Sequence, residues 1–189
     1  MIEKIEAVIL EERPNCLLVY GDTDSTLAGA IAASKLHVPI AHVESGLRSF
    51  NRKMPEEINR IIVDHISEFL FTPTDLATRN LETEGITGAK VRQVGDVMYD
   101  ASIYCGQIAA KKSDLLPQFS LEPKSYAVAT IHREENTEDD SRLQSLIFAL
   151  EAVAKELPVI WTVHPRIKES VKSSALHLTQ PLGYIDMQR

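Results

Sequence analysis

Short apolar runs alternate with helix-like segments along the whole chain, and this alternation limits the possible folds more than any other feature. Each run has the length of a buried strand and is followed by a segment with a helical pattern. The runs fall at 16–20, 38–43, 68–72, 90–94, 126–131 and 158–163. Such alternation is typical of βαβ units, so the sequence predicts an α/β protein whose parallel sheets are covered by helices on both faces.

The segments between the runs carry helix signals. Apolar residues at three- to four-residue spacing predict a helix over 2–12, and alanine-rich and amphipathic stretches predict further helices over 27–36, 75–85, 96–112 and 141–157. Another helix begins at Pro55, the favoured position for proline. Its apolar face is predicted to consist of Ile58, Ile61, Ile62 and Ile66.

The alternation breaks once, between residues 113 and 124. This stretch contains two prolines and no clear period, and the strand–helix pattern restarts after it. We therefore expect two α/β domains, 1–112 and 125–189, joined by a linker over 113–124.

Composition sets the class of protein. A formal net charge of −7 argues against nonspecific nucleic-acid binding, and no apolar stretch approaches the roughly 20 residues of a membrane helix. The only cysteines, Cys16 and Cys105, form no CxxC pair, which favours a reducing compartment. No signal peptide is evident at the start, so we expect a cytoplasmic protein.

Ionisable residues follow almost every predicted strand. Asp22 and Glu44 follow the first two strands, and His132 and His164 follow the last two. Open parallel sheets bind ligands beyond the carboxyl ends of their strands, so these groups are expected at a ligand-binding edge.

Two carboxylates stand out at these strand ends. Asp22 could cap the next helix, but residues 22–26 offer five capping side chains where one suffices, which favours a ligand or catalytic role. Glu44 lies between a strand and the turn at Gly46, where a ligand can approach the backbone closely.

The helix at Pro55 adds further candidates. Glu56 and Glu57 lie in its first turn, where the helix dipole already favours acidic residues, and Arg60 could simply pair with either of them. His132 and His164 are each followed closely by an arginine, a pattern that suits phosphate binding.

Several common motifs are missing. The sequence contains no GxGxxG, no GxxxxGK[ST] and no HExxH. We therefore expect no dinucleotide cofactor, no P-loop and no metal.

Long motifs of this chain resemble the non-hydrolysing UDP-N-acetylglucosamine 2-epimerases: "GDTDSTLAGAIAASKLHVPIAHVESGLRSFNRKMPEEINR", "VGDVMYDA", "TIHREEN" and "VHP". The resemblance covers nearly the whole chain. It implies two Rossmann-like domains of the glycosyltransferase-B type with the active site in their cleft. It also implies a cytoplasmic homodimer that makes UDP-N-acetylmannosamine for surface polysaccharides.

The resemblance also implies roles for residues. Asp22, Glu44 and Glu56 match the catalytic carboxylates of the family, and His132 matches its catalytic histidine. Arg133, His164 and Arg60 are expected to bind substrate. Some bacterial members bind a second UDP-sugar as an allosteric activator. The resemblance implies that Glu56, Arg133 and His164 contact this second ligand.

Some family motifs have no counterpart here. The Gly-Thr-Arg turn and the Asp-Ser-Gly-Gly loop that hold the nucleotide are missing, so we expect both domains to be incomplete and the isolated chain to be inactive. Three other enzymes remain open: a UDP-2,3-diacetamido-2,3-dideoxyglucuronic acid epimerase, a hydrolysing epimerase and a glycosyltransferase. From a different class, the chain could be a non-catalytic UDP-sugar-binding remnant.

Overall fold

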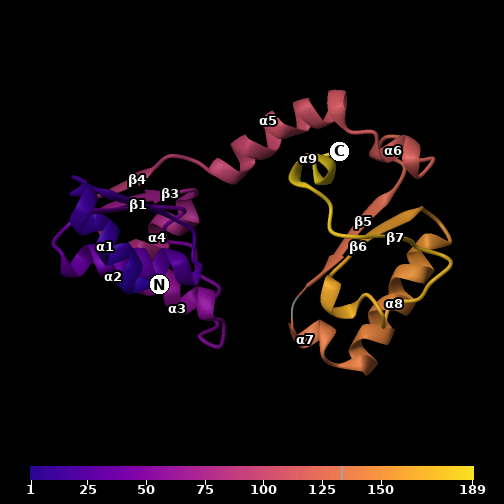
Figure 1. Cartoon of the computed structure of the whole chain (residues 1–189), viewed down its shortest axis with the longest axis horizontal. Helices are drawn as coiled ribbons and strands as arrows, with labels where there is room; N and C mark the ends of the chain where they lie inside the picture. The colour runs from indigo at the N-terminus through magenta and orange to yellow at the C-terminus, as the bar shows by residue number, and fades with distance from the viewer. Residues whose placement is uncertain (133) are drawn as a thin grey trace. The chain divides into compact units, whose positions relative to one another are not determined.

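The chain folds into two α/β units, Met1–Asp100 and Ala101–Arg189. The computed structural model describes residues 1–132 and 134–189, and each unit is built on its own parallel sheet (Figure 1). The long helix α5, Val97–Lys112, contains the division between the units. No helix in the described part of the chain is long and apolar enough to cross a bilayer.

The first unit contains a four-stranded sheet in the order β1-β2-β3-β4, and all neighbouring pairs are parallel. This confirms the alternation predicted from the sequence. In Figure 1, helices α1 to α4 lie on one side of this sheet. The elements are α1 (Ile2–Glu12), β1 (Leu17–Tyr20), α2 (Asp24–Lys35), β2 (Ile40–Val43), α3 (Pro55–Ile66), β3 (Phe69–Thr72), α4 (Asp75–Thr83) and β4 (Val91–Gln93).

The core of this unit lies between the sheet and the helices. Val19 and Ile40 of the sheet pack there with small residues of α2, such as Ala30 and Ala33. Side chains alternate across a strand, so the next residues face the other way. On that second face Leu18, Tyr20 and Phe69 are exposed, whereas the sequence predicted helices on both faces.

Helix α3 packs differently from the sequence-based expectation. Three of the isoleucines predicted to form its apolar face are partly exposed: Ile58 is 43% exposed, Ile62 37% and Ile66 36%, while Ile61 is half-buried. Its buried residues are instead mostly polar or charged: Glu57, Asn59, Arg60, Val63 and Asp64. The burial of these charges was not predicted from the sequence. It is tolerated because they find ionic and hydrogen-bonding partners in the neighbouring turns, which offsets the cost of burying them.

The second unit contains the parallel sheet β5-β6-β7. Strand β6 is covered on both faces: Trp161 packs toward Leu143 of α8, and Ile160 packs toward Leu116 of α6. The elements are α6 (Leu115–Gln118), β5 (Ala127–Ile131), α7 (Glu134–Thr137), α8 (Asp140–Ala154), β6 (Val159–Val163), η1 (Pro165–Ile167), β7 (His177–Thr179) and α9 (Tyr184–Met187).

The segment predicted as a linker, 113–124, lies within this second unit. It contains α6, and its residues Leu116 and Leu121 are buried beside Ile160. The division between the units therefore falls earlier in the chain than the predicted linker. The domain boundaries given above stay a prediction.

Candidate active site

Three charged side chains from separate elements meet at the carboxyl edge of the first sheet. Asp22 follows β1, Glu44 follows β2, and Arg60 lies on α3. The Arg60 Nη2 donates to Asp22 Oδ2 at 2.6 Å and to Glu44 Oε2 at 3.2 Å. Its Nη1 donates to the backbone carbonyl of Glu44. The two carboxylates predicted from the strand ends are thus held side by side by one guanidinium.

Arg60 itself is only 7% exposed, whereas the carboxylate side chains remain open to solvent at 29% for Asp22 and 26% for Glu44. The cation therefore lies beneath the acids and supports them. The alternative that Arg60 merely pairs with Glu56 or Glu57 is not what the structure shows, because both of its described carboxylate partners come from strand ends.

The backbone at this edge is unusual. Glu44 has φ +70°, a left-handed conformation that is uncommon for any residue other than glycine, and Gly21 has φ +64°. A Cβ added to Gly21 would lie 3.2 Å from Glu44 Oε2, so glycine gives this carboxylate its space. Backbone conformations of this kind are kept where the surrounding structure enforces them, often at functional positions.

Glu56 and Glu57 have different surroundings. Glu57 is buried, and its carboxylate accepts the Ser49 N–H at 2.7 Å, the Ser49 hydroxyl at 2.9 Å and the Phe50 N–H at 3.0 Å. Burial raises its pKa, but these hydrogen bonds and the Arg48 charge outweigh that effect, so the pKa of Glu57 lies below its ordinary value. Glu57 thus fixes a loop, while Glu56 is exposed.

A cavity of about 310 Å³ opens beside these residues. Asp22, Glu56 and Arg60 line it together, so the predicted carboxylate of α3 shares a cavity with that of the first strand end. The lining is completed by Leu47, Arg48, Ser49, Met54 and Glu57. Its walls provide both acidic and cationic groups for a polar ligand.

A second charged network lies below the first and was missed by the sequence reasoning. His42 of β2 is fully buried, with its Nδ1 2.7 Å from Asp64 Oδ1 and its Nε2 2.8 Å from the Gly21 carbonyl oxygen. Asp64 Oδ2 accepts the Gly46 N–H at 3.1 Å and Arg48 Nη1 at 2.7 Å. A histidine inside an apolar strand was the available signal.

Arg48 continues this network to α4 and its C-terminal cap. Its Nε and Nη2 bind the two carboxylate oxygens of Glu84 at 2.7 and 2.8 Å. Burial alone would lower the pKa of Arg48, but the ion pairs with Glu84 and Asp64 raise it above the ordinary value. The hydrogen bond from Arg48 is the main reason that the pKa of Glu84 is lowered. The loop after β2 is therefore anchored by fully paired charges.

The other predicted site residues belong to the second unit. His132 follows β5 and is exposed, and His164 follows β6. The His164 Nδ1 accepts the Arg166 N–H at 3.2 Å and caps η1, which leaves the proton of a neutral ring on Nε2. Arg133 lies outside the described residues.

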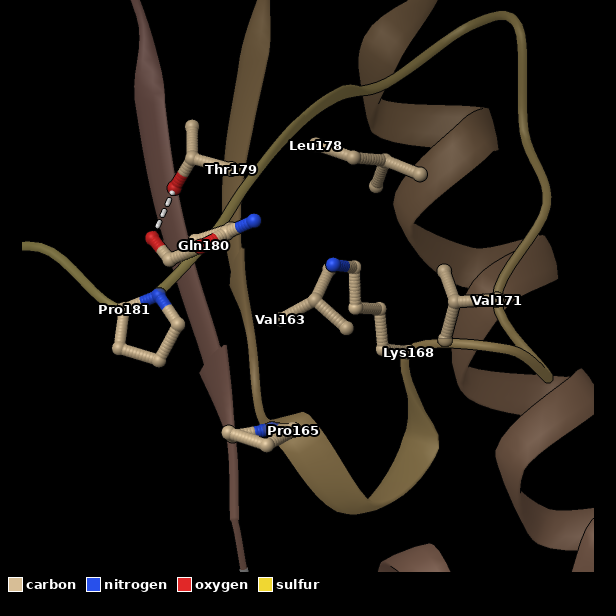
Figure 2. Close-up of a pocket in the computed structure, with 8 residues that line it drawn as sticks. All are labelled: Val163, Pro165, Lys168, Val171, Leu178, Thr179, Gln180 and Pro181. Carbon is tan, nitrogen blue, oxygen red and sulfur yellow. Dashed lines mark hydrogen bonds between the residues drawn. The ribbon is translucent and has the colours of Figure 1, made fainter.

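A cavity of about 310 Å³ lies at the carboxyl ends of β6 and β7 (Figure 2). Its walls are mainly apolar, from Val163, Val171, Leu178 and the prolines Pro165 and Pro181. In Figure 2 the Lys168 side chain lies across the cavity near Val163 and Val171. The second sheet thus also offers a pocket at the edge where parallel sheets bind ligands.

Known proteins with the same sequence pattern clarify what these two units are. The family model for UDP-N-acetylglucosamine 2-epimerase matches residues 1–189. A UDP-2,3-diacetamido-2,3-dideoxy-D-glucuronate 2-epimerase from Pseudomonas aeruginosa is 48% identical over 99% of this chain and 53% of its own length. A UDP-N-acetylglucosamine 2-epimerase from Methanococcus maripaludis is 42% identical over 98% of this chain and 55% of its own length.

A solved structure agrees with these relatives. The Methanocaldococcus jannaschii UDP-GlcNAc 2-epimerase, crystallised with UDP-GlcNAc and UDP, superposes with a TM-score of 0.86. It is 39% identical and is matched over 98% of this chain and 55% of its own chain. The chain described here therefore spans about half the length of the proteins it resembles.

The two parallel sheets flanked by helices, with ionisable groups at their carboxyl edges, place the protein in the class of glycosyltransferase-B-type α/β proteins. Within that class the chain belongs to the UDP-N-acetylglucosamine 2-epimerase family.

Proposed function

We propose that the protein containing this chain is a non-hydrolysing UDP-N-acetylglucosamine 2-epimerase, an isomerase that interconverts UDP-GlcNAc and UDP-ManNAc. The observation that carries the proposal is the pair Asp22 and Glu44, which Arg60 holds together, beside a cavity lined by Asp22 and Glu56. Epimerisation at C2 needs proton removal from one face and proton return to the other, which requires at least two acid/base groups.

The chemistry begins at the anomeric carbon. The C1–O bond breaks, and its electron pair leaves with UDP, giving C1 oxocarbenium character as in glycoside hydrolysis. The neighbouring C2 proton becomes acidic and passes to an enzyme carboxylate, leaving 2-acetamidoglucal with a C1–C2 double bond. A proton then returns to the opposite face of C2, and UDP adds back to C1. Overall no atom is gained or lost.

The residues divide between the two ends of this reaction. Asp22, Glu44 and Glu56 transfer protons at C2 or support that transfer, and Arg60 approaches the substrate from beneath the acids. His132 and Arg133 stabilise the charge that develops on the diphosphate leaving group, and His164 contributes a further substrate contact. A second UDP-sugar acting at Glu56, Arg133 and His164 is the proposed route of allosteric activation.

A second substrate has a specific observation in its favour. The P. aeruginosa relative, named for UDP-2,3-diacetamido-2,3-dideoxy-D-glucuronate, is 48% identical to this chain. The M. maripaludis UDP-N-acetylglucosamine 2-epimerase is 42% identical to it. Assaying the full-length protein with both UDP-sugars by NMR separates the two activities. Detection of UDP-bound rather than free sugar as product excludes a hydrolysing epimerase.

The proton-transfer proposal is tested by running the full-length protein in heavy water. Deuterium should appear at C2 of the product sugar. Replacing Asp22→Asn, Glu44→Gln or Glu56→Gln should each lower kcat on the order of 10²-fold or more, as loss of an acid/base group does. Glu82→Gln, an exposed carboxylate of α4, is the matched control and should keep the wild-type rate. A wild-type rate in any site variant removes that residue from the mechanism.

The setting of the enzyme is part of the same proposal. We infer that it works in the cytoplasm as a homodimer, supplies surface polysaccharide synthesis, and requires no cofactor, metal, nucleic acid or membrane. Light scattering coupled to size-exclusion chromatography of the full-length protein measures its oligomeric state, and a monomer at micromolar concentration would refute the dimer.

A further inference from the structure

A buried imidazole lies directly beneath the proposed proton-transfer groups. His42 is fully buried in β2, on the same face of the sheet as its register partners Val19 and Leu70. The Gly21 carbonyl, 2.8 Å from Nε2, can only accept a hydrogen bond, so Nε2 donates. Nδ1 lies 2.7 Å from Asp64 Oδ1, within hydrogen-bond distance. Each ring nitrogen is thus committed to one partner.

The partners of this ring belong to the two turns that carry the acids. Gly21 immediately precedes Asp22. Asp64, which binds the other ring nitrogen, also accepts the N–H of Gly46, two residues after Glu44. Arg60 binds the two carboxylate side chains and the Glu44 carbonyl, while the His42–Asp64 pair binds the backbone beside them, at Gly21 and Gly46.

We propose that His42 is a positioning residue, which holds the Gly21–Asp22 turn through the Gly21 carbonyl and thereby places the Asp22 carboxylate for proton transfer. The inference rests on the proposed epimerase function. A displacement of about 1 Å in a reacting group can cost about 10²-fold in rate. The hydrogen bond to Gly21 contributes more to placing Asp22 than the hydrogen bond to Asp64, because Gly21 is bonded directly to Asp22.

Two substitutions separate the contacts of the ring. In His42→Gln the amide nitrogen reaches the place of Nε2 and can still donate to the Gly21 carbonyl. In His42→Asn the amide nitrogen reaches only the place of Nδ1, so it can serve Asp64 but not Gly21. Ile9→Ala removes a buried side chain of α1, an element that contributes none of the described site residues, and serves as a destabilising control.

The experiment measures kcat and KM of the full-length enzyme with UDP-GlcNAc and with UDP-2,3-diacetamido-2,3-dideoxyglucuronate. Each rate is normalised to the folded fraction from circular dichroism. We expect His42→Asn to lose 10- to 100-fold in kcat with a smaller change in KM, His42→Gln to stay within tenfold of wild type, and Ile9→Ala to keep the wild-type kcat per folded molecule.

The outcomes distinguish this inference from the function on which it rests. A wild-type enzyme that epimerises neither UDP-sugar overturns the proposed function. An active wild type with equal losses in His42→Asn and His42→Gln, or with losses fully explained by the folded fraction, overturns the positioning role. If His42→Asn does not fold, the kcat of His42→Gln is the deciding measurement. A loss of kcat in His42→Gln as large as that in Asp22→Asn refutes the positioning role.

Discussion

At the residue scale, two glycines near Glu44 shape the site for different reasons. Gly21 leaves room for the Glu44 carboxylate, as described above. Gly46 lies against α4, and a Cβ placed on it would be 2.3 Å from the Ala77 carbonyl oxygen, which is backbone and cannot move aside easily. The turn after β2 is therefore pressed against α4, and only glycine allows that approach.

This close packing gives a prediction with an internal control. Gly46 and Gly85 share a φ of +79°, but a Cβ on Gly85 would meet nothing within 4 Å. Gly85→Ala should therefore cost only the backbone strain, about 1 kcal/mol, while Gly46→Ala should cost on the order of 3 kcal/mol or more. Thermal unfolding of both variants measures the difference. Equal melting temperatures would mean that the Gly46–Ala77 contact does not constrain the turn.

The sequence could predict some residues of the site but not others. Asp22 and Glu44 were found because residues that follow parallel strands meet at one edge whatever the details of packing. His42 and Asp64 were not, because their importance depends on a tertiary contact between a strand and a helix 22 residues apart. Composition and local periodicity do not reveal a pairing of this kind.

At the element scale, α3 organises the part of the candidate site that lies in the first unit. Its first turn holds the Ser49–Phe50 loop through Glu57, its middle holds Asp22 and Glu44 through Arg60, and its later part holds His42 through Asp64. Glu57, Arg60 and Asp64 are spaced by three and four residues, so they lie on one face of the helix.

Glu57 gives this helix a measurable acid dependence. Its pKa is lower in the folded state than the ordinary 4.5, so its contribution to stability is complete above pH 4.5 and is lost as the pH falls through the lower folded value. Glu57→Gln should lower the free energy of unfolding at pH 7 on the order of 1–3 kcal/mol, and this deficit should shrink on acidification. Glu56→Gln, in the same turn, is the control for the helix dipole. Urea unfolding at pH 7 and below pH 4 tests this, and a pH-independent deficit contradicts it.

The long elements were predicted from the sequence, and several of the shortest were missed. The six apolar runs and the long helices were confirmed, including the three-residue β4, which lies within the predicted run 90–94. The missed elements are short: α6, α7 and α9 have four residues each, and η1 and β7 have three. A strand such as β7 forms because the neighbouring β6 offers its backbone groups, which is information that a local pattern cannot contain.

At the scale of the whole molecule, each unit has its own sheet and its own core, and the chain covers about half the length of its relatives. Strand β1 is at the edge of the first sheet, and the exposed Leu18 and Tyr20 lie on it. Open apolar strand edges of this kind favour pairing between chains.

We therefore expect the isolated 189-residue chain to be inactive, to bind UDP weakly and to aggregate. Catalysis of this type depends on binding energy from the non-reacting nucleotide to place C1 and C2, and the family's nucleotide-holding motifs are absent from these residues. Purifying residues 1–189 and following UDP-GlcNAc by NMR tests this expectation, with the full-length protein as the active control. Steady turnover by the isolated chain would show that those motifs are dispensable.

The reversed packing of α3 also changes how natural variants of this helix should be interpreted. In most helices an isoleucine is buried and tolerates substitution poorly, whereas a charged residue is exposed and can be replaced with little effect on stability. Here the order is inverted within the first unit: Ile58, Ile62 and Ile66 face outward, while Arg60 and Asp64 are enclosed by their partners. A change such as Arg60→Lys keeps the charge but removes the planar guanidinium, whose Nη2 binds two carboxylates and whose Nη1 binds the Glu44 carbonyl.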